Sequence, residues 1–199
     1  MTDIRLFNRW DTAGIGVIDP GLGPYINLTP VLVPRTGGRN VKVRFHKNKY
    51  HIVERLINRL MVPGHRGKKH RLTSGRCTGK GQQVYKIVEN CLDIIEKTMN
   101  KNPVEVLVRA IENAAPRDEI TSIEYGGAVY PQAVDCSPHR RVDIALKIMI
   151  QGSYNKSYNG NKKIEQYLAD EIINAYNFDN RSSAIAKKLE LERQADSSR

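Results

Sequence analysis

Hydrophobic residues recur at helical spacing from about residue 50 onward. Apolar positions three and four residues apart fall on one face of a helix, so each such run predicts an amphipathic helix. Six runs follow this pattern: from near 50 to a stop at 63–64, over about 82–99, from 103 to a stop at 116, from 138 through 149, over 164–176, and from about 183. Pro103 suits a first helical turn, and Ser137-Pro138 is typical of an N-cap followed by proline.

One segment breaks the helical pattern. Residues 123–134 read IEYGGAVYPQAV, in which two runs of β-favouring residues flank Gly126-Gly127. A Gly-Gly pair supplies the positive φ values of a two-residue hairpin turn. An isolated hairpin is marginal in water, and Pro131 removes one N–H, which suits an exposed edge. The sequence therefore predicts a projecting hairpin over 119–136, anchored at its base.

The first 47 residues lack helical periodicity and are rich in glycine and proline. Each residue before a proline is pushed away from the helical region, which favours extended and turn conformations. Val41 to Phe45 alternates apolar and basic residues, as a short strand does. We therefore predict a mainly α fold: a six-helix bundle with one protruding β-hairpin and an irregular N-terminal extension. Its parts are an extended basic arm at 1–47 and a helical domain at 48–199.

The composition indicates a polyanionic partner. The 199 residues carry a formal net charge of +11, and 40% of them are hydrophobic, enough for a packed core. A basic excess of this size favours nucleic acid or an anionic membrane surface. No apolar run approaches the roughly 20 residues of a membrane span, and the N-terminus does not resemble a secretory signal. Three widely spaced cysteines argue against a disulfide framework, so we expect a soluble, cytoplasmic protein that binds nucleic acid.

The positive charge is concentrated in one part of the chain. From Arg35 to Lys86 there are fifteen Lys or Arg residues and a single acid, Glu54. Each cation can neutralise a phosphate and release counterions, although a solvated loop is the alternative interpretation. The candidate RNA-binding residues of this region are Arg35, Arg39, Lys42, Arg44, His46, Lys47, Lys49, Arg66, Lys68, Lys69, His70, Arg71, Arg76 and Lys80.

A second cationic cluster lies at Ser137-Pro-His-Arg-Arg141. The start of a helix offers unpaired N–H groups and a partial positive charge, so His139, Arg140 and Arg141 are candidates for phosphate contact. Arg117, at the other base of the hairpin, is a candidate for the same surface. The alternative is a capped helix whose arginines face solvent.

Enzyme and metal sites are not indicated. Gly75 to Gly81 is one residue too short for a phosphate-binding loop, and glycine replaces the hydroxyl that would bind the metal. No Cys-x-x-Cys pair is present, and Cys91 lies on an apolar helical stripe, where a free cysteine is usually part of the core. We therefore predict no enzymatic activity, no cofactor and no metal.

Four segments resemble a known family of ribosomal proteins. They are HIVERLINRLM (51–61), NPVEVLVRAIENAAPRDE (102–119), GGAVYPQAVDCSPHRRVDIAL (126–146) and AIAKKLELERQADSSR (184–199). The chain is similar to the seventh universal ribosomal protein family of the small subunit, in its archaeal and eukaryotic branch. The resemblance covers nearly all of residues 40–199.

The resemblance implies a structural RNA-binding protein in the head of the small ribosomal subunit. It implies binding to the 3′ major domain of the small-subunit rRNA, nucleation of head assembly, and a hairpin near exit-site tRNA and the mRNA exit path. Contacts of the hairpin would fall on Tyr125, Gly126, Gly127, Ala128, Val129 and Tyr130. The ninth and eleventh universal families are the implied protein neighbours, with no membrane contact and no homo-oligomer. An RNA- or DNA-binding regulator outside the ribosome, using the helix pair between Tyr50 and Met99, is the alternative.

Overall fold

The computed structural model describes residues 4–39, 41–65, 72 and 80–199. Within these residues there are six α-helices: α1 (Ile52–Leu60), α2 (Gly81–Met99), α3 (Pro103–Ala114), α4 (Pro138–Ser157), α5 (Ile164–Tyr176) and α6 (Ser183–Asp196). Strands β1 (Asp118–Tyr125) and β2 (Ala128–Asp135) pair antiparallel, and Gly23–Tyr25 and His46–Lys49 form short 3-10 turns. The predicted fold class, mainly α with one hairpin, is confirmed.

Local sequence signals set the helix starts. The Asn102 side chain accepts a hydrogen bond from the Val104 N–H at 3.0 Å, and Pro103 occupies the first turn of α3. Ser182 likewise accepts from the Ala184 N–H at 3.2 Å at the start of α6. Helix α4 begins at Pro138 as predicted, but the Ser137 hydroxyl makes no capping hydrogen bond. Proline alone therefore marks that start.

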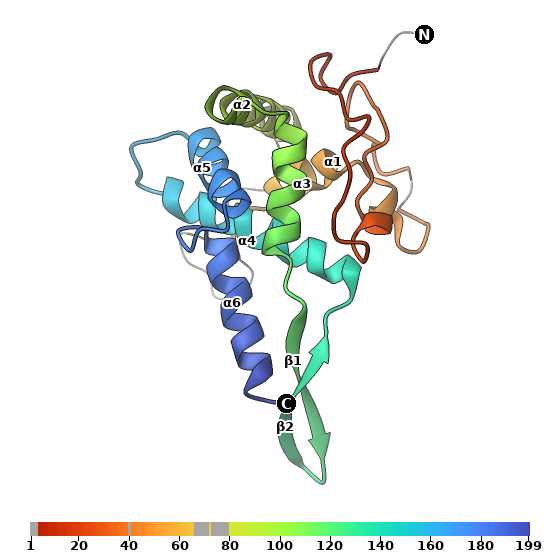
Figure 1. The fold of residues 1–199 in the computed structure, drawn as a ribbon, viewed down its shortest axis with the longest axis vertical. Coiled ribbons are helices and arrows are strands. Elements are labelled where there is room, and N and C mark those ends of the chain that lie inside the picture. Colours follow the sequence, from red (N-terminus) through yellow and green to blue (C-terminus); the bar gives the residue numbers. More distant parts are fainter. Residues whose placement is uncertain (1–3, 40, 66–71, 73–79) are drawn as a thin grey trace.

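Helix α5 packs against three other helices, α2, α3 and α4 (Figure 1). The core between these helices contains fully buried side chains from each of them, including Leu92, Leu107, Leu146 and Leu168. Cys91 is also fully buried in this cluster, as its place on the apolar stripe predicted. The apolar faces of these amphipathic helices therefore form one shared core.

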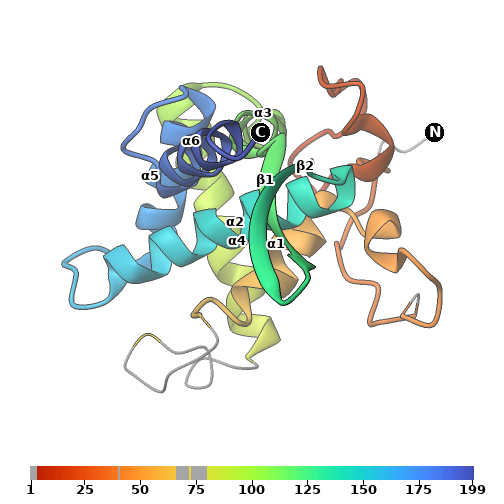
Figure 2. The ribbon, with the colours of Figure 1, turned by 90° about the horizontal axis from the view of Figure 1, so that it is seen from below.

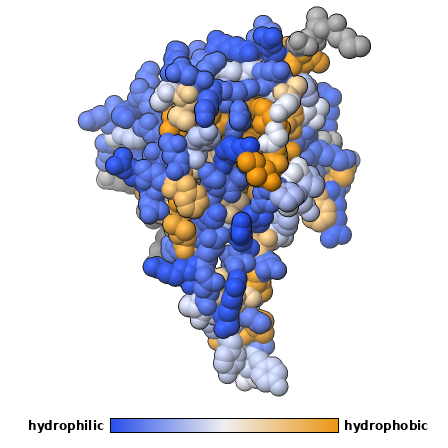
Figure 3. Space-filling view, in the orientation of Figure 1, coloured by the Kyte–Doolittle hydropathy of each residue, from blue (hydrophilic) through white to orange (hydrophobic). Residues whose placement is uncertain are grey.

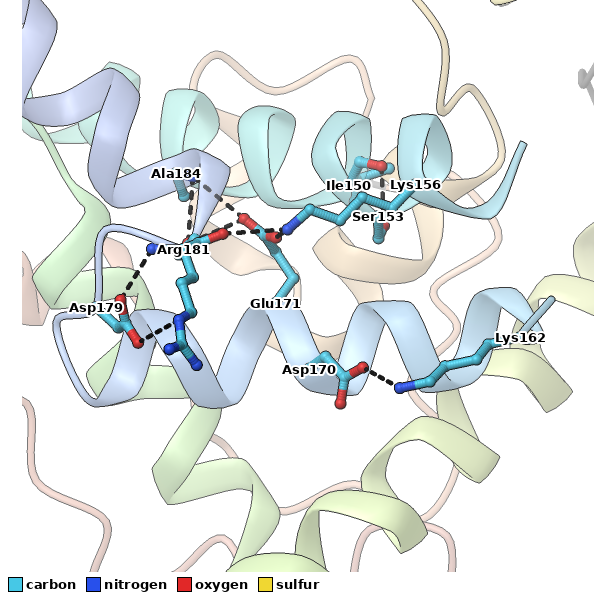
Figure 4. A network of polar contacts seen from close by, with 10 residues as sticks. Ile150, Ser153, Lys156, Lys162, Asp170, Glu171, Asp179, Arg181 and Ala184 are labelled. Atoms are coloured by element: carbon cyan, nitrogen blue, oxygen red, sulfur yellow. Dashed lines mark hydrogen bonds and ion pairs between the residues drawn. The ribbon is translucent and has the colours of Figure 1, made fainter. Parts of the chain in front are cut away.

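A buried carboxylate joins α4, α5 and α6 (Figure 4). The Glu171 side chain of α5 is fully buried, and its Oε2 lies 2.7 Å from Lys156 Nζ of α4. Its Oε1 accepts from Ser182 Oγ at 2.9 Å and from the Ala184 N–H at 3.2 Å. Gly152 of α4 permits this approach, because a Cβ there would lie 2.5 Å from Ser183 Oγ. One acidic group therefore satisfies donors from two neighbouring helices.

The N-terminal segment, residues 4–39, is irregular as predicted, yet it belongs to the same core. Leu6, Trp10, Leu22 and Ile26 are buried in the cluster formed by the helices. Trp10 Nε1 donates to Glu96 Oε2 at 2.9 Å. The segment therefore lies on the helical body, along one side of it in Figure 1. The boundary of a separate arm at residue 47 stays a prediction.

Further polar contacts bind this segment to the helices. Arg9 Nη1 lies 2.7 Å from Asp93 Oδ1 of α2. The Ile18 N–H donates to Glu112 Oε1 of α3 at 2.6 Å. Ion pairs and hydrogen bonds to side chains of the helices therefore hold this irregular segment in place.

The strand predicted at Val41 to Phe45 is wrong. These residues form turns, in which the Val41 N–H donates to the Gly38 carbonyl at 3.1 Å and the His46 N–H donates to the Val43 carbonyl at 3.2 Å. Alternation of apolar and basic residues favours a strand only where another strand supplies hydrogen-bonding partners. Among the described residues no strand lies beside this segment, so its backbone groups bond locally.

The hairpin has the predicted turn and projects from the helical body (Figure 1). Tyr125 pairs with Ala128, and the two intervening glycines have φ values of +58° and +80°. The Ala133 N–H points away from β1 and donates to the Ser198 carbonyl at 3.4 Å. Pro131 lies two residues earlier and shares this outward orientation, so its missing N–H does not interrupt the β1–β2 ladder.

His51 gives the fold a pH dependence. Its Nδ1 accepts from the Val53 N–H at 3.2 Å at the start of α1, and burial lowers the pKa of His51 from 6.5 to about 4. Between pH 6.5 and about 4, His51 takes up a proton in the unfolded chain but stays neutral in the folded protein. Protonation therefore favours the unfolded state, and the fold loses stability as pH falls through this range. We expect the free energy of unfolding to fall by up to about 1.4 kcal/mol per pH unit in that window.

The matched variant is His51→Asn, whose side-chain oxygen can accept the same N–H without titrating. Urea unfolding at several pH values should give a shallower decline for this variant between pH 6.5 and about 4. His139, whose pKa is also lowered by burial, contributes equally to both proteins. Parallel curves for the two proteins would contradict the role given to His51.

Candidate nucleic-acid interface

Helices α1 and α4 lie side by side, with the hairpin standing in front of them when the molecule is seen from below (Figure 2). A cavity of about 430 Å³ lies between the two helices. Its lining holds five Lys or Arg residues, one His and a single acid. We call these polar residues the α1–α4 surface: Lys47, Arg55, Arg59, His139, Arg140, Asp143 and Lys147.

Asp143 organises the cations of this surface. Its carboxylate lies 2.7 Å from Lys47 Nζ, 2.9 Å from Arg55 Nη2 and 3.7 Å from His139 Nε2. Burial alone raises the pKa of Asp143, but the hydrogen bonds from Lys47 and Arg55 outweigh it and hold that pKa below its usual value. Asp143 therefore stays charged and fixes the side chains around it. The Arg55 side chain is only 3% exposed, so we interpret its role as structural support.

Two further cavities continue the α1–α4 surface. One of about 440 Å³ is lined by Arg59, His65, Lys147 and Gln151, among others. The other, of about 640 Å³, runs between α4, α6 and the base of β1. It shares Arg140 and Lys147 with the cavity between α1 and α4. Lys156 and Lys187 add positive charge there beside Glu119 and Glu190. A concave, cationic region therefore extends across α4 on both sides.

The two arginines at the start of α4 have different roles. Arg140 is 59% exposed, and its Nε lies 2.7 Å from Glu119 Oε1 at the base of the hairpin. Arg141 is only 11% exposed, with Nη2 2.8 Å from Asp19 Oδ2 and Nε donating to the Pro116 carbonyl at 3.1 Å. Arg141 therefore holds the N-terminal segment against the start of α4. Contact of either arginine with RNA stays a prediction.

Arg117 lies at the hairpin base with its side chain exposed. Its carbonyl accepts from the Cys136 N–H at 2.7 Å, and its own N–H donates to Glu192 Oε1 at 3.1 Å. The backbone of Arg117 thus joins the hairpin to α6 and leaves the guanidinium at the surface. The position agrees with the predicted location at the hairpin base, and contact of Arg117 with RNA stays a prediction.

The remaining predicted cations divide into two groups. Among the described ones, His46 is half-buried. The others before α1 are exposed: Arg35, Arg39, Lys42, Arg44, Lys47 and Lys49. Lys80 is exposed at the start of α2. The others lie outside the described residues: Arg66, Lys68, Lys69, His70, Arg71 and Arg76.

One face of the hairpin carries exposed aromatic side chains. Residues alternate between the two faces of a strand, so Ile123 and Tyr125 share a face with Glu119, and Tyr130 pairs with Ile123. Tyr125 is 82% exposed and Tyr130 58% exposed. Because Glu119 pairs with Arg140, this face continues from the α1–α4 surface. Figure 3 shows the apolar residues of the hairpin within a largely hydrophilic exterior.

Sequence reasoning missed the cations carried by the helices, chiefly Arg59 and Lys147. The density of charge along the chain does not reveal them, because each is a single charge within a helix. A periodic signal was present on α4, where Arg140, Ile144, Lys147 and Gln151 follow one another at intervals of four, three and four residues. All four line the cavities described above. Residues at this spacing share one face of a helix, so the sequence could have placed these four side chains on a common surface.

The two cysteines that the structure describes, Cys91 and Cys136, show no sign of redox or metal chemistry. Cys91 and Cys136 are both buried and free, and burial raises the pKa of Cys136 to about 11. Over the part of the chain that the structure describes, no group of His, Cys, Asp or Glu side chains is arranged to hold a metal ion. None of the described helices is long and apolar enough to span a bilayer.

Comparison with known proteins identifies the family. The model of "Ribosomal protein S7p/S5e" matches residues 26–199. The chain is 55% identical to the "Small ribosomal subunit protein uS7" of Nanoarchaeum equitans, over 98% of this chain and 99% of that protein. Proteins of the same name from Methanococcus aeolicus and Methanothrix thermoacetophila are 48% and 42% identical, over 99% and 98% of this chain and the full length of each relative. The resemblance inferred from the sequence is therefore confirmed: the chain belongs to the S7p/S5e family of ribosomal proteins.

Proposed function

We propose that this chain is a non-enzymatic structural component of the cytoplasmic small ribosomal subunit, where it binds the 3′ major domain of the rRNA and nucleates assembly of the head. The observation that carries the proposal is the α1–α4 surface, a concave region with five Lys or Arg residues and one acid. Fixed cations in a concave surface suit the phosphates of a folded RNA. The ribosomal identity of the family supplies the class of RNA.

The hairpin adds a second contact. Its exposed tyrosines can stack on unpaired bases or riboses, and its base is fixed by Arg140 and by the C-terminal helix. We propose that its tip reaches exit-site tRNA and the path of departing mRNA. Proteins of the ninth and eleventh universal families are the proposed neighbours.

The alternative, a regulator that reads DNA with α1 or α2, is less well supported. Most of α1 is buried, from Ile52 to Ile57, so it cannot enter a groove as a recognition helix. On the surface of α2, Glu89 and Asp93 are half-buried and Glu96 is exposed, and their negative charges would repel phosphates. A structural RNA-binding role needs only an accessible cationic surface, and the α1–α4 surface is one.

The test is binding of a 3′-domain rRNA fragment at several salt concentrations. Lys147→Gln should weaken binding several-fold and reduce the slope of log K against log salt by about one, because one phosphate contact is lost. Lys162→Gln is the matched control, since Lys162 is an exposed, ion-paired lysine outside the three cavities. Equal effects of the two substitutions would show that the α1–α4 surface is not part of the RNA interface. Failure of the wild-type chain to co-sediment with small subunits would overturn the proposed function itself.

A further inference from the structure

Phe45 is a large aromatic side chain at the surface, 58% exposed. The Arg44 guanidinium lies over its ring at 5.0 Å from the centroid. The His139 imidazole lies edge-on to it, with centroids 6.2 Å apart and planes at 68°. His139 is part of the α1–α4 surface, so Phe45 lies at the rim of that cavity. An aromatic ring left in water costs hydrophobic free energy, which a partner covering the ring would recover.

The surroundings of Phe45 are strongly cationic. Between Arg39 and Lys49 the sequence has five Lys or Arg residues, one His and no acid. Lys42, Arg44 and Lys49 are exposed, and Lys47 is exposed beside Asp143. A protein partner for an apolar residue in this setting would need a concentrated acidic rim. A polynucleotide supplies both the negative charge and flat π-faces in one molecule.

We propose that Phe45, together with the Arg44 guanidinium, is a stacking site for an unpaired RNA base at the rim of the α1–α4 surface. This inference rests on the proposed function and names one part of its ligand: a single-stranded nucleotide beside the RNA held by the cavity. The base stacks on the aromatic ring or on the guanidinium plane, and Lys42 and Lys49 lie within the same cationic loop to receive its phosphates. Stacking makes few hydrogen bonds, so the site accepts any base.

The site is held in place before RNA arrives. His139 Nδ1 lies 2.6 Å from Asn48 Oδ1, and His139 Nε2 lies 3.7 Å from Asp143. These contacts fix the imidazole that flanks the Phe45 ring. Phe45 immediately precedes the 3-10 turn His46–Lys49, whose backbone is closed by the hydrogen bond from the Tyr50 N–H to the Lys47 carbonyl at 3.2 Å. A stacking partner therefore orders little of the loop when it binds, which preserves affinity.

The chain offers a matched control in Phe178. Phe178 is 49% exposed, has the same left-handed backbone (φ +57° against +56° for Phe45), and carries the Lys188 Nζ at 5.5 Å from its ring centroid. It lies between α5 and α6 and lines none of the cavities of the α1–α4 surface. Phe178 therefore shares the local features of Phe45 without its cationic surroundings.

The first experiment compares Phe45→Leu with Phe178→Leu in binding to the 3′-domain rRNA fragment. Leucine keeps apolar bulk and removes the π-face, so Phe45→Leu should weaken binding about 5- to 100-fold. The salt slope should stay that of wild type, because no phosphate contact is lost. Phe45→Trp should restore affinity, and Phe178→Leu should bind as wild type does. Both leucine variants should keep the wild-type unfolding curve, since both rings are exposed.

The outcomes separate this inference from the proposed function. If wild type binds the fragment and Phe45→Leu binds equally well, the stacking site is overturned while the proposed function stands. If wild type does not bind, the proposed function fails first. A photo-crosslinking phenylalanine analogue at position 45, placed in assembled small subunits, should yield a nuclease-sensitive RNA adduct. A protease-sensitive adduct to a neighbouring protein would instead assign Phe45 to a protein interface and overturn the inference.

Discussion

Replacing Glu171 by alanine is expected to lower the free energy of unfolding by about 3 kcal/mol. The substitution removes a fully buried carboxylate from between α4, α5 and α6. It leaves the Ser182 hydroxyl without its acceptor, at a cost of about 1–3 kcal/mol, while the Ala184 N–H loses one of its two acceptors and keeps Ser182 Oγ. Lys156 also loses its partner, although this side chain is 41% exposed and can reach water. Urea unfolding followed by circular dichroism measures the change.

Two variants locate the source of that loss. Glu171→Gln keeps an oxygen for Ser182 and Ala184 and loses the ion pair, so about 1 kcal/mol is expected. Asp170→Ala is the matched control, because Asp170 is the neighbouring acid and pairs with Lys162 at 3.2 Å, but both side chains are more than half exposed. Its effect should stay within about 0.5 kcal/mol. If Asp170→Ala and Glu171→Ala cost the same, the carboxylate does not hold the three helices together.

Replacing Trp10 by alanine is expected to cost about 3–5 kcal/mol in the RNA-free protein. Trp10 is 4% exposed and belongs to the core cluster formed by the helices. Its ring packs edge-on against Phe7, with centroids 5.8 Å apart, and its indole N–H is bonded to Glu96. Alanine would leave a cavity beneath the N-terminal segment and an unpaired carboxylate at its edge.

The sole tryptophan of the chain also provides the readout. In the wild type its emission should indicate a buried indole and should change at the same urea concentration as the helical signal. Ile18→Ala on the same segment is the control, because Ile18 is 71% exposed and should cost almost nothing. Unchanged stability of the RNA-free Trp10→Ala protein would mean that the segment docks only when RNA is present.

The helices and the hairpin could be predicted because their signals are local. Pro103 and Pro138 mark the starts of α3 and α4, and the Gly126-Gly127 turn sets the register of the hairpin. The helix predicted near residue 50 begins at Ile52, because Tyr50 has an extended backbone and His51 caps the first turn. Such features are decided by a few neighbouring residues, so one sequence suffices.

The packing of the N-terminal segment could not be predicted in the same way. Its contacts join residues far apart in the chain, such as Arg9 to Asp93 and Arg141 to Asp19. No periodicity encodes such pairs, and an ion pair can form between many combinations of charged residues. The sequence therefore does not indicate that Arg141 pairs with Asp19 within the protein, and its contact with RNA stays a prediction. In the same way, Lys147 becomes part of a site only when α1 and α4 lie together.

The bond between the Ala133 N–H and the Ser198 carbonyl has a consequence for the order of synthesis. Residue 198 leaves the translating ribosome sixty-five residues after residue 133. During that interval β2 lacks its outer partner, and a two-stranded hairpin on its own is marginal in water. Chains are made from the N-terminus, so the helical body can form while the hairpin base is still loose. The β1–β2 hairpin should therefore be the last part of the protein to reach its final orientation, which it does only after α6 has been made.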